Sequence, residues 1–188
     1  MRRIVTHTAL ALSAVTASAT TTEAQSAFKL TSREIAPNAT IAAAQTFNGF
    51  GCTGTNVSPS LAWSGAPAGT KSFALTMYDP DAPTGSGWWH WVVYNIPATA
   101  KAIAAGAGDV KKNALPAGSV QGNTDFGTPG YGGPCPPAGD KPHRYIFTLY
   151  ALKVEKLDIP AGATAAFVGF NINGNKLGSA TFTGMYGR

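Results

Sequence analysis

KSFALTMYDPDAPTGSGWWHWVVYNIP, residues 71–97, places two strand-like segments on either side of a loop rich in Gly, Pro and Asp. Within 71–78 every second side chain is large and apolar, namely Phe73, Leu75 and Met77. A period of two predicts a β-strand with one strongly apolar face. Residues 90–96 are dense in aromatic and β-branched side chains, which is typical of a central strand. The stretch therefore predicts two strands of a β fold.

The rest of the chain repeats this pattern of strands separated by turns. Further strands are predicted at 144–152 and 178–187, and weaker ones at 27–35, 61–64 and 119–122. Residues 160–173 carry apolar side chains at helical spacing and precede Gly174, which predicts a late helix with a glycine C-cap. These features indicate a mainly β protein, an antiparallel β-sandwich (Greek-key-like) with one or two short helices, including one near the C-terminus.

Composition restricts the class of protein. The 188 residues suit a single domain with a buried core, and only 12% of them are charged. The formal net charge of +5 is spread over scattered Lys and Arg residues, which form no basic stripe for nucleic acid. No apolar run reaches the ~18–20 residues that a membrane-spanning helix needs. We therefore expect neither nucleic-acid binding nor a membrane span.

The first residues have the layout of a secretory signal peptide. Arg2 and Arg3 precede a mildly apolar stretch at 9–17, and small residues follow in patterns that suit cleavage. We therefore expect residues 1–24 to be a signal peptide and residues 25–188 to form one domain. The mature protein is then expected in the periplasm or secreted space.

The chain contains two cysteines, Cys52 and Cys135. An even number of cysteines in an exported chain favours one disulfide bond. Two buried thiols, or thiols in a metal site, are the alternatives. Isolated cysteines without CxxC spacing are weak evidence for zinc, so the disulfide is the preferred interpretation.

Polar side chains gather near the ends of the predicted strands. Asp79 and Asp81 follow the first strand, His90 begins the second, and His143 precedes the strand at 144–152 after the Gly/Pro-rich loop 123–143. Loops held by a rigid scaffold are where binding sites usually lie. The same residues also fit ordinary turn chemistry, a satisfied core histidine, or a His/carboxylate metal site. No GxSxG, HExxH or Walker motif is present.

Three blocks of the sequence resemble the phosphatidylethanolamine-binding protein family, also called Raf-kinase-inhibitor-like proteins. They are SPSLAWSGAPAGTKSFALTMYDPDAP at 58–83, WWHWVVYNIP at 88–97 and GGPCPPAGDKPHRYIFTLYAL at 132–152. The fit is closest to the exported bacterial branch of the family and covers about residues 27–188.

The resemblance implies a β-sandwich with a small pocket at one end for phosphate-like groups or phospholipid headgroups. Carried over by motif, the ligand-binding residues are Asp79, Pro83, His90, Gly133, Pro136, His143 and Tyr145, with Asp81, Trp89 and Trp91 as pocket neighbours. The pocket acid would orient a histidine or hold the pocket backbone, because a bare carboxylate would repel phosphate. A neighbouring carboxylate also raises the pKa of a histidine, which would favour a cationic ring.

Two features depart from the family pattern. Many members have a second histidine where Trp89 stands, and eukaryotic members have a C-terminal helix near the pocket, whereas this sequence continues as TFTGMYGR. We therefore do not transfer kinase regulation from the eukaryotic members.

The leading hypothesis is non-enzymatic binding of a small phosphate-bearing anion, with no metal and no cofactor. One alternative is a protein interaction module that inhibits a protease- or kinase-like partner. The other is a hydrolase in which His143 or His90 acts as general base. The sequence predicts neither a particular protein partner nor an oligomeric state.

Overall fold

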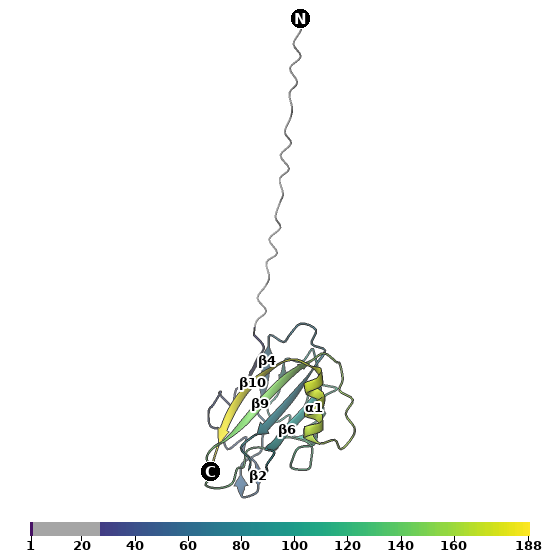
Figure 1. Cartoon of the computed structure of the whole chain (residues 1–188). Coiled ribbons are helices and arrows are strands. Elements are labelled where there is room, and N and C mark those ends of the chain that lie inside the picture. Colours follow the sequence, from purple (N-terminus) through teal and green to yellow (C-terminus); the bar gives the residue numbers. More distant parts are fainter. Residues whose placement is uncertain (2–26) are drawn as a thin grey trace.

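The fold is built around one long antiparallel sheet, which the computed structural model describes together with the rest of residues 27–188 and Met1. Its strand order is β10-β9-β5-β6-β8, and the long strands lie side by side in Figure 1. The bounds are β5 Ser72–Asp79, β6 Trp88–Pro97, β8 Val120–Gln121, β9 His143–Leu152 and β10 Lys176–Tyr186. All neighbouring strands in this sheet are antiparallel.

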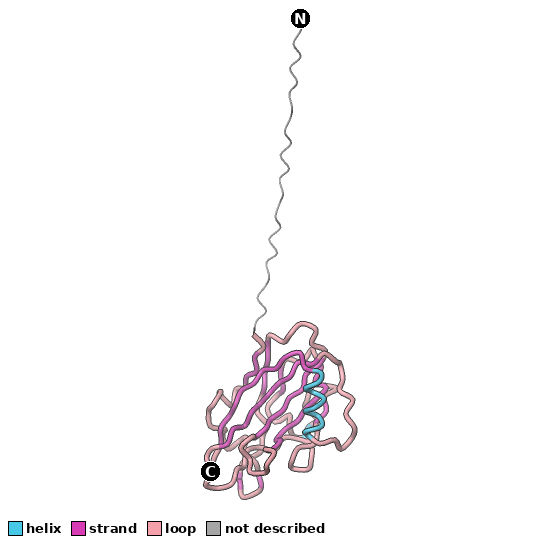
Figure 2. The backbone as a smooth tube through the Cα atoms, viewed as in Figure 1, coloured by secondary structure: helices cyan, strands magenta, loops and turns pink. Residues whose placement is uncertain are grey.

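A smaller sheet packs against the large one. It has the order β1-β4-β7, with bounds Lys29–Thr31, Leu61–Ser64 and Ala102–Ile103. Leu30, Leu61 and Trp63 from this sheet share one core cluster with residues of β5, β6, β9 and β10. Figure 2 shows the strands of the two layers and the loops around them. The predicted antiparallel β-sandwich is therefore confirmed.

Strand β5 shows why the sequence period predicts the layers. Phe73, Leu75 and Met77 belong to the cluster between the two sheets, whereas Ala74 belongs to a second cluster on the outer face. Successive side chains of a strand point to opposite faces, so both faces of β5 are covered. The central position of this strand follows from its having an apolar layer on each side.

The outer face of the large sheet is covered by helix α1, Ala165–Asn175. Ala165, Val168 and Ile172 of the helix pack into the outer cluster. The predicted helix was placed too early, because Gly162 has φ 78° in a turn that precedes the Thr164 N-cap. The predicted C-cap is also wrong.

Gly174 lies inside α1, and Lys176, in an extended conformation, is the C-cap residue. The chain thus passes directly from the helix into β10, which begins at Lys176, without the left-handed turn that a glycine C-cap makes. Four short elements were not placed by the sequence: strand β7, a 3₁₀ helix η1 at Val110–Lys112, and strands β2 (Asn48–Gly49) and β3 (Cys52–Thr53), which form a hairpin.

The two cysteines form a disulfide, as predicted. The Cα atoms of Cys52 and Cys135 are 6.0 Å apart and the sulfur atoms are bonded. The bond joins the β2–β3 hairpin to the Gly/Pro-rich loop that precedes β9. Within residues 27–188, no helix has the length and apolar character needed to cross a membrane. The predicted signal peptide at 1–24 falls, except for Met1, outside the described residues.

Candidate functional site

A register shift in β6 aims His90 into the interior of the sandwich. On β5, Met77 pairs with Trp91 and the next residue, Tyr78, pairs with Trp89, so His90 is an extra residue between them. An extra residue of this kind is a β-bulge, which turns a side chain away from strict alternation. Consequently His90 and Trp91 both face inward although they are adjacent in sequence.

Asp79 connects the end of β5 to the start of β9. Its Oδ2 lies 2.8 Å from Nδ1 of His143, and its Oδ1 accepts the Asp81 backbone N–H at 2.8 Å. Asp79 and His143 are both buried. The carboxylate therefore orients the imidazole ring and also holds the loop that follows β5, which is the role that the family resemblance implied for the pocket acid.

Asp81 ties the same loop to the surface of β9. It accepts hydrogen bonds from Nε and Nη2 of Arg144 at 2.9 and 2.7 Å, and from the Arg144 backbone N–H at 2.9 Å. This pairing lowers the pKa of Asp81 to about 2. Asp81 thus points away from the pocket and fixes its rim.

His90 is buried beneath the pocket and carries no charge near neutral pH. Its Nδ1 lies 2.7 Å from the Gly132 carbonyl oxygen, which only accepts, so Nδ1 carries the proton and Nε2 has the lone pair. Burial lowers the pKa of His90 to about 4, although the Gly132 carbonyl and Asp79 oppose the change. The expectation of a cationic ring is therefore wrong for His90, because desolvation outweighs the nearby carboxylate.

Tyr145 presents a buried hydroxyl group at the same place. The residue has 0% exposure, and its Oη has no hydrogen-bond partner among the described residues. Its ring meets that of His90 edge to face with centroids 5.1 Å apart. Burial, the charge of Asp79 and a weak interaction of the hydroxyl with the Asp79 carboxylate, too poor in geometry to count as a hydrogen bond, raise the pKa of Tyr145, so the hydroxyl keeps its proton and remains a donor.

These residues surround a pocket of about 170 Å³ at one end of the large sheet. Asp79, His90, His143 and Tyr145 supply its principal polar side chains, and most of the remaining lining is aromatic or proline. The complete lining is Phe50, Asp79, Ala82, Pro83, Thr84, Trp88, His90, Phe126, Cys135, Pro136, Pro137, His143 and Tyr145. An apolar wall around a few convergent polar groups is the usual form of a small-ligand site.

The structure brings together six of the seven residues carried over from the family, all except Gly133. Gly133 instead donates its N–H to Oδ1 of Asn56 at 2.7 Å. A Cβ atom at Gly133 would lie 2.1 Å from the Gln45 carbonyl oxygen. Close backbone packing therefore requires glycine at this position.

The two tryptophans expected as neighbours do not line the pocket. Trp91 is fully buried in the core, and its Nε1 donates to Oε1 of Gln121 at 2.9 Å. Trp89 packs on the helix-covered face, 4.6 Å from the Tyr78 ring. The tryptophan in the pocket is Trp88, which pairs with Asp79 across the β5–β6 ladder.

Phe50 and Phe126 are the other aromatic lining residues that motif reasoning missed. Phe126 lies within the Gly/Pro-rich loop whose position the sequence singles out, but the loop also contains Tyr131, and nothing in the sequence distinguishes which of the two rings reaches the pocket. Phe50 comes from the β2–β3 hairpin, 29 residues before Asp79 (79 − 50 = 29). Nothing in the local sequence around Phe50 indicates that the hairpin reaches this site.

The arrangement suits hydrogen bonding to a small anion. The Tyr145 O–H makes no hydrogen bond of good geometry among the described residues, and both pocket histidines have Nδ1 engaged, which leaves Nε2 as their second polar atom. The Nε2 atom of His143 lies 3.5 Å from Oδ2 of the exposed Asp140. Across residues 27–188, His, Cys, Asp and Glu side chains form no group of three or more that could hold a metal ion.

Comparison with known proteins gives a consistent match. A family model described as "Phosphatidylethanolamine-binding protein" matches residues 31–187. UPF0098 protein YbcL of Escherichia coli (strain K12) is 51% identical over 186 residues, which cover 99% of this chain and 98% of YbcL. The crystal structure of E. coli YbcL, described as a new member of the mammalian PEBP family, is similar with a TM-score of 0.84 and 53% identity over 86% of this chain and 98% of that chain.

A more distant relative comes from Mycobacterium tuberculosis (strain ATCC 25618 / H37Rv). Its name, LppC, marks it as a candidate lipoprotein. It is 41% identical over 137 residues, which cover 73% of this chain and 63% of LppC.

Proposed function

The chain belongs to the phosphatidylethanolamine-binding protein family, and from that premise we propose that its pocket binds a small phosphate-bearing anion without chemically changing it. Membership of the family suggests ligand binding. The nature of the ligand is inferred from the polar groups of this pocket.

The observation that carries the proposal is the Tyr145 hydroxyl. A buried polar group without a partner costs stability, and native proteins rarely keep one without a reason. Here the hydroxyl lies in a pocket whose other polar groups are already held by Asp79 and the Gly132 carbonyl. An incoming anionic oxygen would supply the missing acceptor.

The two histidines would play different parts. His90 is neutral, so its Nε2 lone pair suits a protonated oxygen, such as the P–OH of a phosphate monoanion. His143 is oriented by Asp79, and its Nε2 lies 3.5 Å from the solvent-exposed carboxylate of Asp140. A phosphate that displaces Asp140 would take that position. The Tyr145 donor and the His90 acceptor together favour a partly protonated phosphate over a simple halide or carboxylate.

The pocket offers little for nucleophilic catalysis. Cys135 is bonded to Cys52, and the Thr84 hydroxyl donates to the Gly87 carbonyl oxygen. The Tyr145 hydroxyl, with its raised pKa, is a poor nucleophile near neutral pH. These features support binding without turnover. Release of product from phosphoester or carboxylic ester substrates, lost in His90→Ala, would contradict this part of the proposal.

The test of binding is calorimetric titration with inorganic phosphate and with phosphoethanolamine. We expect saturable binding to the wild-type protein and at least about tenfold weaker binding to His143→Ala, because the variant lacks one hydrogen-bonding group to a charged ligand. Arg33→Ala, on the exposed surface after β1, is the control and should bind normally. Absence of binding to the wild type, or equal binding by all three proteins, would refute the site.

We also infer that the chain works outside the cytoplasm. The disulfide, the leader-like residues 1–24 and the similarity to LppC support this inference, since disulfides persist in oxidising compartments. Mass spectrometry of the protein from periplasmic and cytoplasmic fractions of a Gram-negative host tests it. Recovery of an uncleaved, reduced chain from the cytoplasm alone would contradict it.

A further inference from the structure

The β2–β3 hairpin brings an exposed aromatic ring to the mouth of the pocket. Phe50 is 68% exposed yet lines the pocket. Its backbone has φ 53°, a left-handed conformation that is unfavourable for a bulky side chain. Sequence selection for stability alone would favour a small or polar residue at such a place. The position of the Phe50 ring is therefore better explained by a role in the pocket than by stability.

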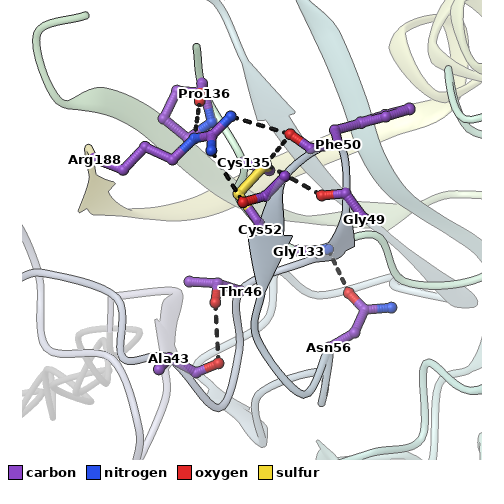
Figure 3. Close-up of a disulfide and its surroundings, with 11 residues drawn as sticks. Ala43, Thr46, Gly49, Phe50, Cys52, Asn56, Gly133, Cys135, Pro136 and Arg188 are labelled. Atoms are coloured by element: carbon purple, nitrogen blue, oxygen red, sulfur yellow. Dashed lines mark hydrogen bonds between the residues drawn. A yellow bond between two sulfur atoms is a disulfide. The ribbon is translucent and has the colours of Figure 1, made fainter. Parts of the chain in front are cut away.

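At its base the hairpin is joined to the loop before β9 by the Phe47 backbone N–H, which donates to the Pro134 carbonyl at 3.0 Å, and two further links lie nearer the hairpin tip. The first is the Cys52–Cys135 disulfide. The second is the guanidinium of Arg188, which donates from Nε to the Pro136 carbonyl at 2.7 Å, and from Nη1 and Nη2 to the carbonyls of Gly51 and Phe50 at 3.2 and 3.1 Å. Figure 3 shows the guanidinium beside the disulfide, reaching from Pro136 to Phe50.

The backbone of Arg188 is anchored to the same loop. Its main-chain oxygen accepts the Gly139 N–H at 2.9 Å. The preceding Gly187 packs so closely on Pro142 that an added Cβ would lie 3.1 Å from the Pro142 Cα. Because both its main chain and its side chain are held, the guanidinium acts as a fixed bridge between the pocket loop and the hairpin.

The Phe50 ring, whose backbone carbonyl accepts from Arg188, belongs to a continuous aromatic wall. Phe50 and Phe126 are nearly parallel, with an interplanar angle of 13° and centroids 6.0 Å apart. Phe126 in turn meets the His90 ring edge to face at 5.5 Å. The wall thus runs from the exposed mouth down to the polar floor, which is formed by Asp79, His90 and Tyr145. A ligand whose anionic end reaches this floor would place its remaining atoms along the wall.

We propose that Arg188 is a positioning residue that holds Phe50 in this wall, and that the wall selects anions bearing a flat apolar substituent over the bare anion. The inference rests on the proposed anion site, because the wall acts only on what the polar floor holds. Aromatic surfaces gain most from flat partners stacked or set edge to face on them, so the ligand class is a phosphate-like anion with an attached aromatic ring.

Only arginine matches the three acceptors. Its planar fork presents several N–H donors in fixed directions, whereas lysine offers a compact charge on a flexible stem. Arg188→Lys therefore keeps the positive charge and loses the geometry, while Arg188→Gln loses both. Comparing the two variants separates positioning of the hairpin from simple attraction of an anion.

The experiment compares the affinities for inorganic phosphate and phenyl phosphate, together with amide hydrogen exchange in 48–53. We expect wild type and the control Arg33→Gln to bind phenyl phosphate about tenfold more tightly than inorganic phosphate. Arg188→Gln and Arg188→Lys should both lose this preference, with inorganic phosphate affinity changing less than threefold, and exchange in 48–53 should become faster.

Three outcomes would overturn the proposal. In the first, the wild type has no preference for phenyl phosphate. In the second, Arg188→Lys keeps the preference while Arg188→Gln weakens both ligands equally, which would mean that Arg188 acts by charge. In the third, hydrogen exchange in 48–53 is unchanged in both variants. The exchange measurement needs no ligand, so a wild type that binds neither anion would refute the proposed function, and exchange would still decide whether Arg188 holds the hairpin.

Discussion

His90 combines almost complete burial with a titratable ring. Burial lowers its pKa from 6.5 to about 4 in the native protein. Protonation therefore favours the unfolded chain, and the stability that neutral His90 provides is present above pH ~6.5 and lost as the pH falls toward ~4. A difference of this size is worth about 3 kcal/mol.

We predict that the free energy of unfolding of wild type falls more steeply between pH 6.5 and 4 than that of His90→Asn, by up to about 3 kcal/mol over the interval. Urea unfolding at successive pH values measures both proteins, and the other titrating groups, which both retain, cancel in the difference. Equal pH dependence would show that the native ring is accessible to protons.

Some residues of the site could be predicted from the sequence and others could not. Asp79, His90 and His143 are polar residues at predicted strand ends, and such residues converge because strand ends meet at one edge of a sheet. The prediction that Trp89 and Trp91 lie beside the pocket was wrong, because the tryptophan that lines it is Trp88. Strict alternation assigns their directions incorrectly, because the bulge at His90 shifts the phase, and a bulge depends on the partner strand.

The position of the C-terminal end of α1 can be tested at Gly174. A glycine C-cap has positive φ, where a Cβ is costly, whereas Gly174 lies within α1 and has open space at its Cβ position. Alanine is better than glycine inside a helix by about 1 kcal/mol. We predict that Gly174→Ala raises the free energy of unfolding by about 0.5–1 kcal/mol, measured by urea unfolding. A loss of stability would instead place Gly174 at the helix end.

Elements differ in how well a sequence predicts them. Strands β5, β6, β9 and β10 are long enough for their apolar alternation or aromatic density to stand out. Strands β2, β3 and β7 have two residues each, which is too short for any period to be recognised. Their positions depend on contacts made after the sandwich forms, and the placement of Phe50 was missed with them.

At the scale of the whole molecule, the disulfide links residues 83 apart in sequence. The chain-entropy relation gives an upper value of about 4–5 kcal/mol for closing such a loop. We predict that Cys52→Ser/Cys135→Ser lowers the free energy of unfolding by several kcal/mol and loosens the pocket mouth. Urea unfolding of both proteins measures the change, and a loss below about 1 kcal/mol would contradict it.

The whole account depends on the pocket being a site for a phosphate-bearing anion, with the Tyr145 hydroxyl as a donor. Tyr145→Phe removes that one atom and leaves the ring in the core. Because the hydroxyl has no partner in the free protein, the variant should be at least as stable as wild type in the absence of ligand.

The most direct measurement is the calorimetric affinity for inorganic phosphate of wild type and Tyr145→Phe, with their unfolding free energies as control. We predict an affinity at least about tenfold lower in the variant, since a hydrogen bond to a charged ligand is worth about 1.5–3 kcal/mol, together with unchanged or greater stability. Equal affinity of the two proteins for phosphate would contradict the central claim.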